Sequence, residues 1–320
     1  MPALLDKRLI FVTGKGGVGK TSVATAIGLL AARRGLRTIV AELAGQQRIQ
    51  QVFDRQDVQF SEIELASRLF TISIDPQHAM QEYLHVKTGL LGDALGASRL
   101  FGAFAMAAPG MRELLSLGKV WELAQPRRRT HGAGRYDLVV VDAPASGHCA
   151  GLLHTPKTFA EIARVGPIAH QGRAIAASVA DHRFTGVVAV TTLEEMPVNE
   201  TLWLSEVLAN DDLVLDVVII NAVYPPRFEP EELADLRSAL ARTRSRLARS
   251  ALKAALSEHA RTAMQREQRA RLQAGFGGPL VDLPYVFAER LGRSELAVLA
   301  DALEPGLLAG QPEDVASRGA

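Results

Sequence analysis

The amino-acid sequence predicts a doubly wound α/β fold with a mostly parallel sheet. Short runs of Val, Ile and Leu recur along the chain without polar alternation, which is typical of strands buried on both faces of a parallel sheet. Segments with apolar residues at helical spacing separate these runs, as the crossover connections of such a sheet require. The chain has 320 residues, of which 48% are hydrophobic, so it can bury a large core.

Six segments are the predicted strands. The first spans residues 9–13 and ends in a glycine-rich loop, and a helix is predicted over residues 21–34, where Gly35 ends it. The other predicted strands span residues 37–43, 69–74, 137–141, 186–191 and 214–221.

Two helical insertions interrupt this alternation. Residues 86–125 are apolar and are divided at Pro109-Gly110, and residues 229–274 are rich in Arg and Ala. In the second insertion one predicted apolar face carries four leucines, Leu233, Leu236, Leu240 and Leu247. We expect both insertions to be appendages of one domain over residues 1–304, followed by a loose tail at 305–320.

Composition restricts the classes of function. The chain has 36 Lys and Arg against 35 Asp and Glu, so its overall charge is close to zero. The overall charge therefore does not favour nucleic acid or a charged membrane as the main partner. A single cysteine, Cys149, excludes a disulfide framework and any metal site that needs two cysteines from one chain. We see no secretory signal and no apolar run of about 20 residues. We therefore expect a cytoplasmic protein whose membrane association, if any, is peripheral.

A phosphate-binding loop is predicted between the first strand and the first helix. Residues 14–21 read GKGGVGKT, which fits the pattern G-x-x-x-x-G-K-[ST] of P-loop proteins. Backbone N–H groups of such a loop and the N-terminus of its helix bind a polyphosphate. We expect Lys20 to bridge the β- and γ-phosphates and the Thr21 hydroxyl to bind Mg²⁺. The predicted nucleotide-binding residues here are Gly14, Lys15, Gly16, Gly17, Val18, Gly19, Lys20, Thr21 and Ser22.

An aspartate at the end of a buried strand is the second part of this predicted site. Val139-Val140-Val141 is followed by Asp142, at the position where a carboxylate holds Mg²⁺ through water. The alternative is that Asp142 only caps the element that follows the strand.

The loop and several other segments resemble the ArsA-type anion-pump ATPase family, which includes the ATPases that target tail-anchored proteins. Lys15 makes GKGGVGKT the deviant Walker A form typical of MinD, ParA and ArsA ATPases. Residues 142–148, DAPASGH, resemble the family's switch II sequence DTAPTGH. Further matches lie at residues 74–76, 82–83, 108–110 and 194–201, and the resemblance extends over residues 7–300.

This resemblance implies an ATP-binding dimer with ATP between the subunits. Lys15 is then expected to reach the partner's nucleotide and neutralise charge on the transferring phosphoryl group, as an arginine finger does. Asn221 and, in a weaker match, Pro284 are expected to contact adenine. The expected partner is an identical chain or a paralogous ATPase, with a membrane protein or another apolar client and no specific nucleic acid.

One position departs from the family pattern. After the second strand the family has an aspartate that positions the attacking water. Aligning the second strand of this chain with that of the family places Ala44 at the position of this aspartate. Either Glu42 or Gln46 replaces it, or the register is shifted by two residues and Glu42 is the catalytic acid. In the preferred interpretation the chain hydrolyses ATP poorly alone and donates Lys15 to a competent paralogue. The candidate catalytic residues are Lys15, Lys20 and Glu42.

Features on the client side of the family are sparse here. Cys149 alone can supply neither an arsenite site nor a zinc pair, so we expect it to be a packing residue. For residues 86–125 we prefer packing against the protein's own core or its partner to a groove for an apolar client helix. For the Arg-rich insertion we prefer a solvated face interspersed with acids to binding of lipid or nucleic acid.

The residues and the family resemblance leave three candidate functions. The leading one is a dimeric switch that ATP closes and hydrolysis opens, coupled to a client or membrane partner. The second is a hydrolysis-deficient regulatory subunit paired with a paralogue. The third is a ParA/MinD-like positioning ATPase.

Overall fold

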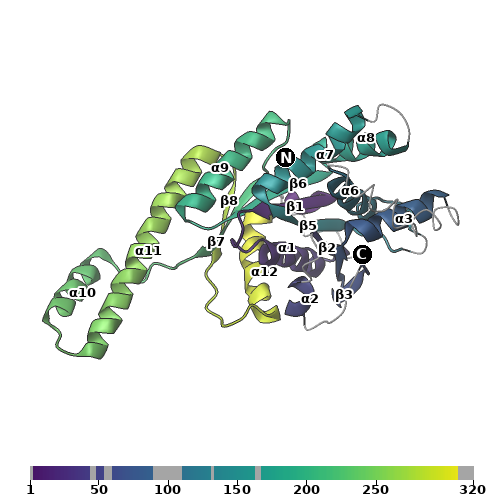
Figure 1. Ribbon diagram of the computed structural model, residues 1–320. Coiled ribbons are helices and arrows are strands. Elements are labelled where there is room, and N and C mark those ends of the chain that lie inside the picture. The colour runs from purple at the N-terminus through teal and green to yellow at the C-terminus, as the bar shows by residue number, and fades with distance from the viewer. Residues whose placement is uncertain are drawn as a thin grey trace, which may run out of the picture.

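A single mixed sheet lies at the centre of the structure (Figure 1). The structure is a computed structural model and describes residues 3–43, 48–53, 60–88, 110–130, 133–162 and 167–308. Its strands are β1 (Leu9–Gly14), β2 (Thr38–Leu43), β3 (Ile63–Ala66), β4 (Leu69–Ile74), β5 (Leu138–Ala145), β6 (Thr185–Thr191), β7 (Val217–Val223) and β8 (Leu280–Pro284). The strand order is β3-β4-β2-β5-β1-β6-β7-β8. The pair β3–β4 is antiparallel and the other neighbouring pairs are parallel. The predicted fold class is confirmed.

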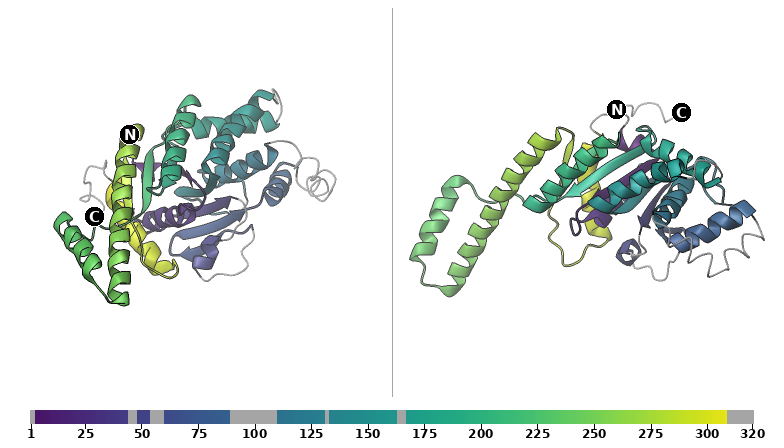
Figure 2. Two further views of the ribbon diagram at one scale, coloured as in Figure 1. Left: turned by 60° about the vertical axis from the view of Figure 1, so that its left-hand side comes forward. Right: turned by 45° about the horizontal axis from the view of Figure 1, so that its top comes forward.

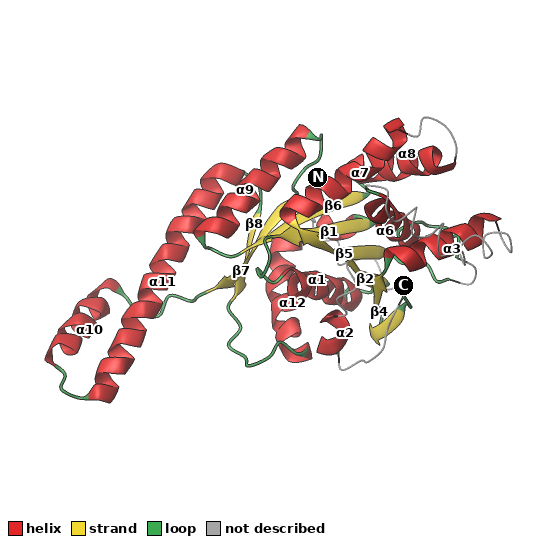
Figure 3. Ribbon diagram, in the orientation of Figure 1, coloured by secondary structure: helices red, strands yellow, loops and turns green. Residues whose placement is uncertain are grey.

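Helices cover both faces of this sheet (Figure 3). In chain order they are the 3₁₀ turn η1 (Leu4–Asp6), α1 (Lys20–Arg33), α2 (Arg48–Val52), α3 (Pro76–Thr88), α6 (Met111–Leu123), α7 (Ser146–Ile162), α8 (Pro167–Ala180), α9 (Glu195–Asn210), α10 (Pro230–Arg242), α11 (Arg246–Phe276) and α12 (Arg293–Leu308). Successive strand residues point to opposite faces, so the chain forms two apolar layers. Ile10 and Val12 pack with α1 and α12, whereas Leu9 and Phe11 pack with α6, α7, α8 and α9.

The six predicted strands are present, and two others were not predicted. The sequence prediction relied on continuous apolar runs, which mark strands buried on both faces. The two edge strands lack that pattern, because only Leu65 is buried in β3 and only Val281 and Leu283 are buried in β8. An edge strand with one covered face leaves too few apolar residues to identify it.

The first predicted insertion contributes α6 to the core. Leu114, Leu117, Val120 and Leu123 are buried against the sheet, so this part packs against the protein's own core. Residues 89–109, which include Leu100, Phe101, Phe104 and Met106, lie outside the described residues. Met111, Leu114, Leu115 and Trp121 are described, and they line a cavity between α3, α6 and α8.

The second predicted insertion is a helical hairpin formed by α10 and α11, which extends away from the sheet (Figures 1 and 2). One part of the prediction was wrong. Leu233 is 8% exposed, but Leu247 is 82% exposed and does not share its face. The reason is a break at residues 243–245, where the Ser245 side chain accepts from the Ala248 N–H and starts a new helix.

The C-terminal boundary also differs from the expected loose tail. Helix α12 continues through Pro305 to Leu308, and Leu303 and Leu307 are buried. Apolar packing therefore keeps residues 305–308 helical, and residues 309–320 lie outside the described part. Among the described helices, none is long and apolar enough to cross a membrane.

Candidate nucleotide-binding site

Three glycines determine the shape of the loop between β1 and α1. Gly14, Gly17 and Gly19 have φ values of 144°, 88° and 95°, which other residues rarely adopt. A Cβ on Gly14 would lie 2.0 Å from the carbonyl oxygen of Val190, and one on Gly19 would lie 2.3 Å from Nδ2 of Asn221. The loop is therefore packed closely against the carboxyl ends of β6 and β7.

The first residues of α1 place two predicted site residues next to this loop. The Lys20 ammonium donates to the Lys15 carbonyl oxygen at 3.0 Å, within the loop. The Thr21 hydroxyl donates at 2.6 Å to Oδ2 of Asp142, which lies in the C-terminal half of β5. These residues lie 121 positions apart in sequence. The structure thus brings the predicted loop and the predicted aspartate together at one edge of the sheet.

Glu200 of α9 links the loop to the segment that resembles switch II. Its Oε2 lies 2.9 Å from the Lys15 ammonium, and its Oε1 accepts from the Ser146 hydroxyl at the start of α7. Burial alone would raise the pKa of Glu200. The hydrogen bond from the Ser146 hydroxyl and the hydrogen bond and charge of Lys15 together have a larger effect in the opposite direction, so the pKa is lowered. Sequence reasoning gave Glu200 no role, because its partners lie 54 and 185 residues away.

Glu42 lies on the strand beside Asp142. In the parallel pair β2–β5 the two residues are directly opposite in register, so their side chains point to the same face of the sheet. Glu42 is 2% exposed, and its Oε1 accepts from the Ile49 N–H of α2 at 3.3 Å. Ala44 and Gln46, the other residues of the switch I question, lie outside the described residues.

The predicted adenine-contacting residues lie on the neighbouring strands β7 and β8. Asn221 donates from Nδ2 to the Val18 carbonyl oxygen at 2.9 Å, and Pro284 pairs with Val223. Ala222, directly after Asn221, has φ 59° in the left-handed region.

A side chain of the hairpin supports this strained backbone. Gln265 of α11 donates to the Ala222 carbonyl oxygen at 3.0 Å and accepts from the Tyr224 N–H at 2.9 Å. The hairpin therefore contacts the backbone that follows Asn221.

A cavity of about 660 Å³ opens beside the loop, within the size range of small-molecule sites. Among the predicted residues, Gly16, Gly17, Gly19, Lys20, Thr21, Ser22 and Asp142 line it. Gly14, Lys15, Val18, Glu42, Asn221 and Pro284 do not. Sequence reasoning missed Gln51 and Arg290, which line the cavity from α2 and from the loop before α12.

Two further observations concern metal and thiol chemistry. Within the described ranges there is no group of three or more His, Cys, Asp or Glu side chains that could hold a metal ion. Cys149 is fully buried, and burial raises the pKa of its thiol to about 11. Its predicted role as a packing residue is confirmed.

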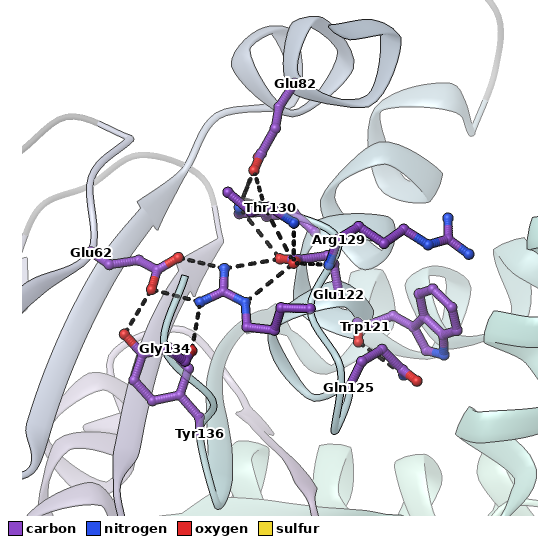
Figure 4. A network of polar contacts seen from close by, with 11 residues as sticks. Glu62, Glu82, Trp121, Glu122, Gln125, Arg129, Thr130, Gly134 and Tyr136 are labelled. Carbon is purple, nitrogen blue, oxygen red and sulfur yellow. Dashed lines mark hydrogen bonds and ion pairs between the residues drawn. The ribbon is translucent and has the colours of Figure 1, made fainter. Parts of the chain in front are cut away.

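A separate, partly buried polar cluster ties α6 and the segment before β5 to the sheet edge at β3 (Figure 4). Arg128 donates to Glu62 at 2.6 and 2.8 Å and to Glu122 at 3.0 and 3.2 Å, and Tyr136 donates to Glu62 at 2.8 Å. Burial is the largest single influence and raises the pKa of both carboxyls, but the hydrogen bonds of Arg128 and other neighbouring donors, with the charges of Arg128 and Lys119, together outweigh it, so both pKa values are lowered. We assign this cluster a structural role.

The amino-acid sequence of the chain also matches a known protein family. Residues 7–171, just over half of the chain, match the family model of the anion-transporting (ArsA) ATPases. The chain belongs to the ArsA ATPase family.

Curated relatives agree with this assignment. ATPase BagA of Mycobacterium tuberculosis is 36% identical over 235 residues, which cover 71% of this chain and 68% of the relative. The arsenical pump-driving ATPase of Escherichia coli is 27% identical over 271 residues, 78% of this chain and 44% of the relative. ATPase ASNA1 homolog 1 of Paramecium tetraurelia is 29% identical over 149 residues, 46% of this chain and 43% of the relative. The resemblance stated from the sequence is confirmed.

Proposed function

We propose that this chain is a cytoplasmic, ATP-driven conformational switch that binds Mg-ATP at the β1–α1 loop and acts as a dimer. The observation that carries the proposal is the convergence of Lys20, Thr21 and Asp142 at the carboxyl edge of a parallel sheet, beside a cavity of nucleotide size. An ammonium and a hydroxyl at a helix N-terminus, with a carboxylate on the adjacent strand, are the groups that phosphoryl transfer requires.

Each of these groups has a proposed task. The Lys20 ammonium leaves the Lys15 carbonyl oxygen and binds phosphate oxygens instead. The two side-chain oxygens of Thr21 and Asp142, 2.6 Å apart, suit Mg²⁺, a hard cation that takes oxygen ligands and few protein groups. Bound there, Mg²⁺ neutralises charge on the phosphates. Asn221 and Pro284, next to the loop, are proposed to contact adenine.

The surface beside Lys15 supports a partner subunit on this side of the molecule. Met196, Glu200 and Trp203 follow one another at positions i, i+4 and i+7 of α9, so they share one helix face. Met196 is 61% exposed and Trp203 is 45% exposed, flanking the Glu200–Lys15 contact. Exposed Trp and Met side chains are typical of the centre of protein interfaces. We propose that Lys15 leaves Glu200 and reaches the partner's nucleotide across this face.

Hydrolysis and coupling follow from the same arrangement. Glu42, on the Asp142 face of the sheet, is the proposed residue for positioning water in a self-sufficient homodimer. Since Ala44 replaces the expected aspartate, the alternative is a subunit that donates Lys15 to a competent paralogue.

The Gln265 contacts offer a route by which nucleotide binding near Asn221 changes the position of the hairpin. A membrane protein or another apolar client is the proposed partner of the switch.

Sedimentation velocity with ATP, ADP or no nucleotide tests the switch. Wild type should become dimeric with Mg-ATP, and Lys20→Ala should lose the nucleotide-dependent change. Lys15→Ala should bind ATP like wild type but fail to hydrolyse it, alone or when paired with a paralogue purified from the same cells. An equal loss of ATP affinity in both variants would contradict the role of Lys15 in the partner's site.

A further inference from the structure

The outer part of the α10–α11 hairpin concentrates positive charge. Residues 236–257 contain six of the 36 Lys and Arg residues of the chain and none of its 35 Asp and Glu residues. We call this segment the basic tip; its cations are Arg237, Arg242, Arg244, Arg246, Arg249 and Lys253. The nearest acids, Asp235 and Glu258, lie at its two borders. The expected face interspersed with acids is therefore wrong for this segment.

The six cations of the basic tip are all exposed and lack carboxylate partners in the described part of the chain. Their side-chain contacts are neutral ones, from Arg242 to the Ser238 hydroxyl and from Arg249 to the Thr243 carbonyl oxygen. By contrast, Arg227 and Arg269 at the base of the hairpin each pair with an acid. Like charges held close together repel one another, so this arrangement favours an anionic partner.

The basic tip also presents a large apolar side chain. Leu247 lies in the first turn of α11, between Arg246 and Arg249, and is 82% exposed. Helix α11 has 31 residues and is about 46 Å long. The figures show the tip at the outer end of the hairpin, away from the sheet (Figures 1 and 2). The tip can therefore touch a flat surface ahead of the sheet and the helices that cover it.

We propose that the basic tip is a site for peripheral binding to anionic lipid membranes. The arginines and lysine contact lipid phosphates, and Leu247 enters the boundary between headgroups and acyl chains. Leu247 decides between a membrane and nucleic acid, because a leucine gains nothing from a phosphate backbone but is stabilised when apolar lipid removes it from water. The proposal does not depend on the proposed nucleotide chemistry.

Flotation of the full chain with lipid vesicles tests this site. We expect binding to vesicles with 30% phosphatidylglycerol in phosphatidylcholine and none to pure phosphatidylcholine. Combined Arg244→Glu, Arg246→Glu and Arg249→Glu should weaken binding by about 100-fold or more, since each cation near an anionic surface contributes about a factor of five. Leu247→Ala should weaken it roughly fivefold.

A matched control carries the same change of charge elsewhere. Arg112, Lys157 and Arg183 are exposed on the body of the molecule, and their combined replacement by Glu should leave vesicle binding within twofold of wild type. Circular dichroism melting of all variants confirms that they are folded, which keeps the comparison valid.

Three outcomes would overturn the proposal. These are equal binding to neutral vesicles, an unchanged affinity in the triple tip variant, and a loss as large in the control variant as in the tip variant. A tip-dependent affinity for double-stranded DNA, without vesicle binding and without an effect of Leu247→Ala, would replace the membrane with nucleic acid.

Discussion

Replacing Glu200 by Gln separates the resting position of Lys15 from its proposed action in the partner's site. The amide keeps the size of the side chain and a hydrogen-bonding group for Ser146, but removes the charge that faces Lys15 at 2.9 Å. The side chains of Lys15 and Glu200 are 35% and 24% exposed. Solvent therefore screens the ion pair, which contributes about 0.5–1 kcal/mol, within the range of exposed pairs.

That free energy sets the size of the expected effect. If Lys15 must leave Glu200 before it reaches the partner's nucleotide, releasing it raises the population of the competent state by about two- to fivefold. Turnover of Glu200→Gln at saturating Mg-ATP and high protein concentration should rise by that factor. The affinity for ATP should stay within about twofold, because Glu200 does not line the cavity beside the β1–α1 loop.

A phosphate-release assay at several protein concentrations, repeated in a Lys15→Ala background, completes this test. In that background Glu200→Gln should have no effect, since the side chain that it releases is gone. Where the isolated chain turns over too slowly, the same comparison is made with the purified paralogous partner. An unchanged or lower rate in the single variant, or the same rise in both backgrounds, would refute the reasoning.

The remaining predictions concern the loop and the polar cluster. Gly19→Ala should raise the Kd for a fluorescent ATP analogue more than tenfold. The backbone of residue 19 has φ 95°, which alanine rarely adopts, and the added Cβ would lie 2.3 Å from Nδ2 of Asn221. An unchanged Kd in equilibrium titration would count against the loop geometry. Arg128→Met should lower the free energy of unfolding in urea by about 3–5 kcal/mol, because the Glu62 carboxylate loses its ion-pair partner and Glu122 keeps only Lys119 at 3.5 Å. A loss below about 1 kcal/mol would contradict a structural role. Both carboxyls have a lowered pKa in the folded state, so their contribution is present above the unfolded value of about 4.3 and is lost as pH falls through the folded pKa. The difference between wild type and Arg128→Met should therefore shrink below about pH 4, and a gap that widens there would be the wrong sign.

Local sequence patterns predicted the centre of the fold and the phosphate loop. Buried parallel strands leave continuous apolar runs, and the loop needs glycines and a lysine at a fixed spacing, so both can be identified within a few residues. The meeting of Thr21 with Asp142 was also predictable, because carboxyl ends of parallel strands share one edge of the sheet.

The features that were missed depend on contacts between distant segments. Glu200 and Lys15 are 185 residues apart, and Arg128 and Glu62 are 66 apart, so no local pattern connects them. Helical periodicity extended through residues 243–245 predicts Leu247 on the apolar face, but the break there starts a new helix and leaves Leu247 exposed. Pro305 suggested the end of the ordered chain, but buried leucines on α12 keep it helical.

Steady-state hydrolysis of Mg-ATP by the purified chain, with bound nucleotide quantified alongside, tests the central claim most directly. We expect saturable Mg-ATP binding by the wild-type chain, which Lys20→Ala abolishes. Turnover above the Lys20→Ala background indicates a self-sufficient ATPase, and binding without turnover indicates a subunit that needs a competent partner. Absence of ATP binding in the folded wild-type chain, or hydrolysis that persists unchanged in Lys20→Ala, would contradict the account.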